Sequence, residues 1–209
     1  MALLLFALGL LMMFYLGTYV QTREIISGLF ISQWLLLLAP TVLILWYTRT
    51  DLRKSLRLYR PSLAAVLAAV VLAAGVYILT LQATHWQRSF MPPPEEYTRQ
   101  FEQIFEQGRG DAGFWILLAA VAVSPAVCEE VLFRGAIFSG LRGRMQPIAA
   151  MIVVSLLFAF MHMSVYSLLH TFLLGLALAY LVERTGSIFP AMLFHFCING
   201  TSTAASTGR

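Results

Sequence analysis

Residues 113–141 read GFWILLAAVAVSPAVCEEVLFRGAIFSGL, and this stretch is the most informative part of the chain. It is apolar enough to enter a bilayer, yet its centre carries three ionisable residues within six positions: Glu129, Glu130 and Arg134. Ionisable side chains are costly inside a membrane, and they occur there mainly where they pair with one another or serve a function. The stretch therefore predicts a membrane helix that carries a polar centre.

The rest of the chain is similarly apolar. Of the 209 residues, 59% are hydrophobic and only 11% are charged, and the mean hydropathy is +0.78. A soluble domain is roughly half apolar and about a quarter charged. The composition thus predicts an integral membrane protein. Its long apolar runs favour membrane helices over the alternating segments of about 10 residues that form a β-barrel.

Apolar segments that could cross a bilayer recur along the chain. We expect seven of them, at 3–20, 28–47, 63–81, from 113 onward, 147–163, 165–182 and 188–199. The last is short for a span, which needs about 20 residues. We detect no repeat and no low-complexity linker between them. The sequence therefore predicts an all-α, polytopic membrane helix bundle of about seven transmembrane helices, with residues 1–209 forming one integral membrane domain.

The basic residues indicate an orientation. The loop at 48–61 holds five basic residues and one acid, whereas the loop at 82–111 holds three arginines and five acids. Because Lys and Arg prefer cytoplasmic loops, we expect the N-terminus in the cytoplasm and the C-terminus outside. The formal net charge of +4 is explained by this topology signal, so we expect the lipid bilayer as a partner and no nucleic acid.

Residues 91–107, MPPPEEYTRQFEQIFEQ, interrupt the apolar pattern in the longest loop. Phe101, Ile104 and Phe105 have helical spacing there, which predicts a short amphipathic helix lying on the outer membrane surface. The helix could be a solvated connector, or it could be a lid that controls access of a substrate.

The charged residues in the centre of 113–141 have different expected roles. Glu130 and Arg134 are four apart, so on a helix they face each other in the favoured order for an ion pair. Glu129 points about 100° away and lacks that partner, which leaves it free to take up a proton in a reaction. Pro125 is expected to kink the helix one turn before the glutamates. Glu130 and Arg134 are thus predicted to be structural, and Glu129 chemical.

Two later segments add polar groups at helical spacing. His162 follows Phe158 by one turn, and His195 and Asn199 are likewise four apart on a shared face. A single histidine in an apolar helix is commonly a core residue, but these two histidines, the asparagine and Glu129 lie on three different segments. Together they favour a functional site. His170, near the outer end of its segment, is expected to be structural.

The depths of these groups constrain the helix at 113–141. At 1.5 Å per residue, His162 lies ~22 Å above the inner end of its segment, and His195 and Asn199 lie at ~10 and ~16 Å. Glu129 reaches a similar depth, ~18 Å, only if its helix continues to about residue 141. The sequence therefore predicts one long helix there.

Three motifs resemble a known family. They are EEVLFR at 129–134, FAFMH at 158–162 and HFCIN at 195–199, and they match the pattern EExxxR, FxxxH and HxxxN of the CPBP family, also called the Abi or type II CAAX-prenyl endopeptidase family of intramembrane proteases. Each motif alone is weak, but all three in order on successive membrane segments are specific. The resemblance covers the motif region at 113–199.

The resemblance implies a membrane-embedded peptidase of the glutamate type that needs no cofactor and no metal. Glu129 and His162 would activate the attacking water, and His195 and Asn199 would stabilise the oxyanion. Glu130, Arg134 and Phe158 would shape the site.

The implied substrate is a membrane-associated protein or peptide cut near the membrane. In one branch of the family this is the C-terminal tripeptide of prenylated CaaX proteins. The small size of the chain suggests the cytoplasmic (inner) membrane of a prokaryote.

Two alternatives remain open at the level of the residues. Glu129, His162 and His195 could be three ligands of a Zn²⁺ ion with an open fourth position, as in a zinc-dependent membrane protease. Buried Glu, His and Arg residues also build proton relays in transporters, and a non-proteolytic immunity protein could keep the same scaffold. Detection of a cleavage product would separate the proteases from the other readings.

Overall fold

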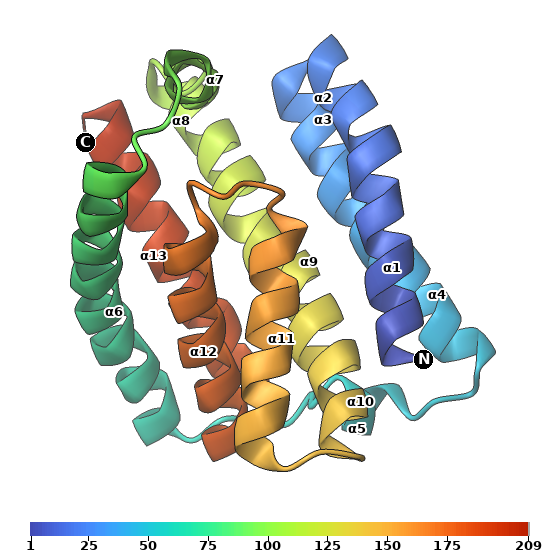
Figure 1. The fold of residues 1–209 in the computed structure, drawn as a ribbon. Helices are drawn as coiled ribbons and strands as arrows, with labels where there is room; N and C mark the ends of the chain where they lie inside the picture. Colours follow the sequence, from blue (N-terminus) through green and yellow to red (C-terminus); the bar gives the residue numbers. More distant parts are fainter. Residues whose placement is uncertain (209) are drawn as a thin grey trace.

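The computed structural model describes residues 1–208, which contain helices, turns and loops and no β-strand. The helices form seven columns that stand side by side (Figure 1). Several columns contain π-helical turns, labelled η. The first column is α1 (Ala2–Met12), η1 (Met13–Gly17) and α2 (Thr18–Arg23), and the second is α3 (Ile25–Phe30), η2 (Ile31–Leu38) and α4 (Ala39–Tyr47). The third is α6 (Leu63–Phe90).

The fourth column contains the glutamates. It comprises α8 (Asp111–Leu118), η3 (Ala119–Val123), α9 (Ser124–Glu130), η4 (Val131–Ile137) and α10 (Phe138–Arg142). The last three columns are α11 (Pro147–Met161), α12 (Leu168–Thr185) and α13 (Phe189–Thr207). Two short helices lie outside the columns, α5 (Leu52–Ser55) and α7 (Glu95–Glu106).

The prediction of an all-helical membrane bundle is confirmed, but seven spans are not. Within the described residues, five helical columns are long and apolar enough to cross a membrane: Ala2–Arg23, Ile25–Tyr47, Leu63–Phe90, Asp111–Arg142 and Leu168–Thr185. The other two fall short for different reasons. α11 is apolar but only 15 residues long, and the second half of α13 is rich in Thr and Ser.

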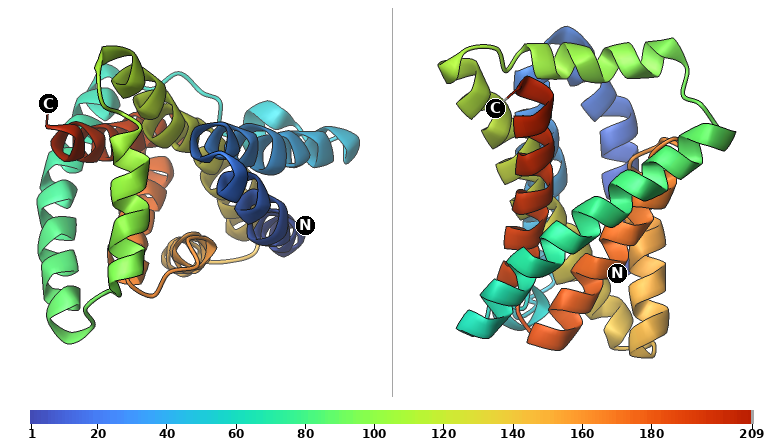
Figure 2. Two further views of the ribbon diagram at one scale, coloured as in Figure 1. Left: turned by 90° about the horizontal axis from the view of Figure 1, so that it is seen from above. Right: turned by 90° about the vertical axis from the view of Figure 1, so that its left-hand side faces the viewer.

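The predicted long helix is present, because Asp111–Arg142 runs on for 32 residues. It is also the most buried span. Of its most apolar stretch of 18 residues, 61% is buried inside the protein, against 17–39% for the corresponding stretches of the other four spans. This column lies between the N-terminal helix pair and the group formed by α6, α12 and α13 (Figures 1 and 2). Side chains on its different faces therefore meet several other helices, and this places the glutamates at the centre of the bundle.

The column accommodates Pro125 next to a π-helical turn. Proline has no N–H, so it cannot bond the carbonyl four residues earlier, which belongs to Val121. That carbonyl instead accepts a hydrogen bond of 3.0 Å from Nδ2 of Asn199 on α13. η3 immediately precedes Ser124 and Pro125, as expected where an irregular turn relieves a break in the helical ladder. Two columns are thus tied together at the irregular point of one of them.

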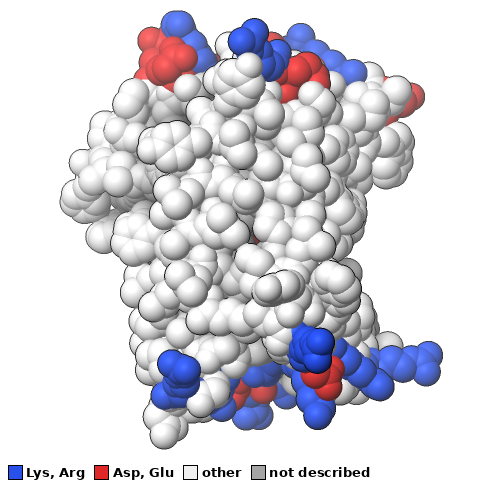
Figure 3. Space-filling model, turned by 90° about the vertical axis from the view of Figure 1, so that its right-hand side faces the viewer, with Lys and Arg blue, Asp and Glu red and all other residues white. Residues whose placement is uncertain are grey.

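Charged side chains gather at the two ends of the molecule, and an apolar band separates them (Figure 3). This arrangement is expected of a protein whose middle contacts lipid tails and whose ends contact water. The predicted amphipathic helix is present as α7, which lies across one end of the bundle (Figure 2). It reaches the loop after α11, where the rings of Tyr97 and Tyr166 lie 5.2 Å apart.

The other end is closed by the loop around α5. Arg57 donates to Ser139 Oγ at 3.2 Å and to the Val182 carbonyl at 3.1 Å, and it lies 3.7 Å from Glu183. Arg142 binds the same carboxylate through two hydrogen bonds of 3.0 Å. Burial lowers the pKa of the Arg57 guanidinium, and the charge of Glu183 partly opposes that shift. The loop is therefore fastened to α10 and α12 by one shared carboxylate.

Candidate active site

The predicted ion pair is the buried centre of the site. Arg134 Nη1 donates to Glu130 Oε1 at 2.9 Å, and both side chains are fully buried. Nη2 of the same arginine donates to the Gly175 carbonyl on α12 at 3.3 Å. The guanidinium also lies over the ring of Phe158 on α11, 4.3 Å from its centroid. A buried charge needs this degree of pairing, because leaving water costs several kcal/mol for each ion.

Glu130 also orients a histidine. Its Oε1 lies 2.9 Å from Nδ1 of His195 on α13. A carboxylate oxygen accepts, so the histidine donates its Nδ1–H. This bond directs the other ring nitrogen, Nε2, toward Glu129, whose Oε2 lies 4.0 Å away. The ion pair thus holds the imidazole that faces the second glutamate.

Glu129 is held by a residue that the sequence analysis did not single out. Its Oε1 accepts a hydrogen bond of 2.8 Å from Nε2 of Gln33 on η2. Its Oε2 is buried and has no hydrogen-bond partner among the described residues. The 4.0 Å to His195 Nε2 is too long for a direct hydrogen bond. The signal that could have revealed Gln33 was an amide side chain inside the apolar segment at 28–47.

His162 lies at the C-terminal end of α11 and is the more exposed of the two histidines. Its Nδ1 is 2.9 Å from the Phe158 carbonyl. A carbonyl only accepts, so this Nδ1 carries the proton and Nε2 keeps its lone pair. The edges of both histidine rings meet Phe158, with centroids 4.9 Å from it for His162 and 6.0 Å for His195. Phe158 is therefore the common packing partner of Arg134 and the two imidazoles.

Asn199 lies one turn after His195 on α13, as its spacing predicted. One Nδ2 hydrogen is used in the bond to the Val121 carbonyl. The amide has a second Nδ2 hydrogen to donate and an oxygen that can accept. The structure thus gives Asn199 a role in joining α13 to η3, beside the role in catalysis that the resemblance implied.

A zinc site gains no support from the geometry. Among residues 1–208, no group of three or more His, Cys, Asp or Glu side chains is placed so that it could hold a metal ion. Glu129, His162 and His195 therefore do not form the three-ligand set that the zinc alternative requires. His195 donates Nδ1–H to Glu130, a contact that also orients histidine ligands in metal sites.

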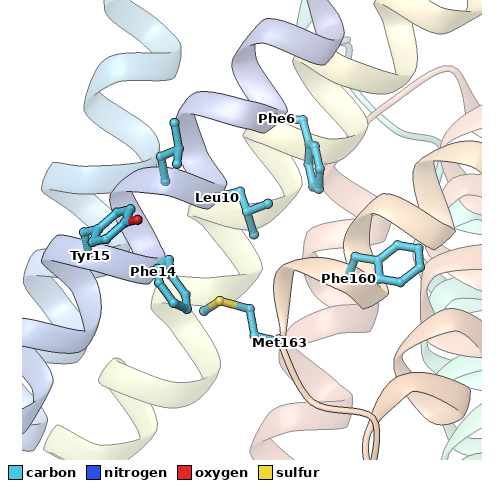
Figure 4. A pocket seen from close by; sticks show the side chains of 7 residues that line it. Phe6, Leu10, Phe14, Tyr15, Phe160 and Met163 are labelled. Atoms are coloured by element: carbon cyan, nitrogen blue, oxygen red, sulfur yellow. The ribbon is translucent and has the colours of Figure 1, made fainter.

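An apolar pocket of about 500 Å³ opens between the first column and the end of α11 (Figure 4). Its lining is almost entirely apolar and comprises Phe6, Leu10, Leu11, Phe14, Tyr15, Phe160 and Met163. Met163 directly follows His162 in the chain. One lining residue of the pocket is thus the chain neighbour of the more exposed histidine of the site.

These observations define a polytopic helical membrane protein with a buried Glu–Arg–His network at its centre. Residues 111–201 match the family described as type II CAAX prenyl endopeptidase Rce1-like. This match confirms, for that part of the chain, the resemblance drawn from the three motifs. The matched region is less than half of the chain and excludes the first three columns. Comparisons with curated proteins and with solved structures gave no match.

Proposed function

We propose that the protein is an intramembrane endopeptidase of the glutamate type. The observation that carries the proposal is Glu129 Oε2, which is buried without a hydrogen-bond partner among the described residues and lies 4.0 Å from His195 Nε2. A contact longer than 3.5 Å between two polar groups is one that a water molecule can bridge. The family to which residues 111–201 belong hydrolyses peptide bonds, and that reaction requires such a water.

Charge balance supports a proton in this gap. Glu129 and Glu130 carry two negative charges when ionised, and Arg134 carries one positive charge. Because net charge is costly in a buried site, the cluster favours one further proton, which His195 Nε2 or Glu129 Oε2 can hold. The site is therefore suited to proton transfer at these two atoms.

In the proposed reaction, Glu129 removes a proton from the water while the water oxygen bonds to the scissile carbonyl carbon. His162 Nε2 accepts a hydrogen bond from the same water. The charge that develops on the carbonyl oxygen is stabilised by protonated His195 and by the second amide hydrogen of Asn199. Donors of this kind contribute about 3–4 kcal/mol each. The C–N bond then breaks, and the proton passes from Glu129 to the leaving amine.

The apolar pocket supports a lipid-modified substrate. A hydrocarbon chain gains about 0.8 kcal/mol for each methylene that it buries, and pockets of 300–1,000 Å³ are typical of ligand sites. The pocket is lined by the first membrane span and by Phe160 and Met163 at the end of α11, where Met163 follows His162 in the chain. We propose that it takes the prenyl chain of a CaaX substrate, so that the peptide attached to the chain enters the site beside it.

The charge distribution supports the orientation expected from the sequence. The end closed by the α5 loop carries Arg57 and Arg142, and cytoplasmic loops are enriched in Arg and Lys. We propose that this end faces the cytoplasm of a prokaryotic cell. The N-terminus is then inside and the C-terminus outside.

The test is a cleavage assay in detergent on a panel of prenylated CaaX peptides and unmodified membrane-protein tails, read by mass spectrometry. The wild type should cut at least one prenylated peptide, with or without EDTA, and Glu129→Gln should lower kcat by about 10²–10⁴-fold. Activity that EDTA abolishes and Zn²⁺ restores would favour the zinc protease. If the wild type cuts nothing in the panel, the proton-relay and immunity functions become the leading candidates.

A further inference from the structure

We propose that Gln33 is a positioning residue of the active site, which holds Glu129 so that only Oε2 is available to act on water. The inference rests on the proposed function and adds a residue that lies outside the matched region, 111–201. Gln33 lies on the second column, which carries none of the three motifs, and it bonds the glutamate of the fourth column that is proposed to act on water.

The burial of Gln33 argues against a passive role. Its side chain is 7% exposed and lies in the span Ile25–Tyr47. An amide at such a place costs free energy unless it is bonded. Only Nε2 is satisfied, by Glu129. The amide oxygen is buried without a partner among the described residues, which makes it a second acceptor in the site. An apolar side chain would be the more stable choice if packing alone were required.

The geometry determines which way the amide faces. While Glu129 is ionised, its Oε1 can only accept, so Gln33 must present its NH₂ group rather than its oxygen. The neighbouring residue strengthens the alignment, because Trp34 Nε1 donates to Ser124 Oγ at 2.9 Å. Two consecutive side chains of η2 thus bond two points of α9. π-helical turns such as η2 occur frequently at functional sites.

The chemistry of glutamine suits this position. A lysine or arginine here would hold Glu129 as an ion pair and reduce its ability to take a proton. A neutral amide fixes one carboxylate oxygen and leaves the charge in place. The charged or titratable groups close to this carboxylate are His195 from α13, together with Cys128, Glu130 and Arg134 on its own column. Gln33 is therefore the amide donor in a set otherwise made of charged or titratable groups.

The test compares Gln33→Leu with Gln21→Leu in the full-length protein. Gln21 is the matched control, because it lies on the adjacent column and its amide bonds Ser32 Oγ at 2.9 Å instead of a glutamate. On the peptide that the wild type cleaves fastest, Gln33→Leu should lower kcat by about 10–100-fold, as replacement of residues that support an active site does. The KM of the variant should stay within about twofold of the wild-type KM. Gln21→Leu should match the wild type.

A second measurement needs no substrate. In infrared difference spectra, the carboxylate band of Glu129 is identified by its loss in Glu129→Gln. In Gln33→Leu this band should shift in frequency, because the carboxylate loses a hydrogen-bond donor. If the wild type cuts no peptide, the proposed function fails. The spectra still test the contact between Gln33 and Glu129 in that case, because they need no substrate. Gln33 has no positioning role if the band is unchanged, or if lost activity merely follows lost folded protein in size-exclusion chromatography.

Discussion

Glu130 is the residue on which the site depends most directly. A single oxygen, Oε1, accepts from both Arg134 and His195, so one side chain neutralises a buried cation and orients an imidazole. The sequence predicted the first contact, because two residues four apart on a helix must meet. It did not predict the second, which joins residues 65 apart in the chain.

We expect Arg134→Met to destabilise the protein by about 3–5 kcal/mol, because it leaves Glu130 as a buried charge without its cation. Thermal unfolding in detergent should show a clear fall in Tm, whereas Arg144→Met, at an exposed position, should show little change. The double variant Glu130→Leu/Arg134→Met should recover part of the loss. If the double variant is less stable than Arg134→Met alone, the isolated charge is not the cause.

Among the elements, the fourth column shows how an irregular helix can be stabilised from outside. Pro125 leaves the Val121 carbonyl without its usual partner, and Asn199 supplies one from α13. This bond fixes the height of α13 beside α9, and hence the height of His195 beside the two glutamates. The proline and the asparagine are thus linked through one backbone oxygen.

A double-mutant cycle on Pro125 and Asn199 should reveal this link. Asn199→Ala should cost about 1–3 kcal/mol, because it leaves a partly buried carbonyl unsatisfied. In the Pro125→Ala background the new backbone N–H can bond Val121, so the same change should cost at least about 1 kcal/mol less. Unfolding free energies in detergent would supply the four values. Additive effects would show that the two residues act independently.

For the molecule as a whole, the important feature is the interface between the N-terminal helix pair and the helices that carry the motifs. The apolar pocket lies at that interface, with Leu10 and Phe14 on one side and Phe160 and Met163 on the other. Gln33 reaches across the same interface to bond Glu129. The first column therefore lines the pocket and the second column binds the Glu129 carboxylate, although neither column carries a family motif.

We expect Leu10→Trp to fill the pocket and raise KM for a prenylated peptide by about tenfold, the equivalent of one to two methylenes left in water at about 0.8 kcal/mol each. Cleavage of an unmodified peptide should keep its kcat/KM. Leu4→Trp, on the lipid-exposed face of α1, provides the control. An equal loss for both peptides would mean that the pocket does not hold the prenyl chain.

The sequence by itself determined the membrane class, the helical architecture, the long helix from residue 113 to about residue 141 and the Glu130–Arg134 pair. These follow from hydropathy and from 3.6-residue periodicity, which act within one segment of the chain. The tertiary structure determined that five columns meet the requirements of a span, that His195 faces Glu129, that Asn199 bonds Val121 and that Gln33 holds the glutamate. Those contacts join distant segments, and their partners depend on how the helices pack and rotate against one another, which no local pattern encodes.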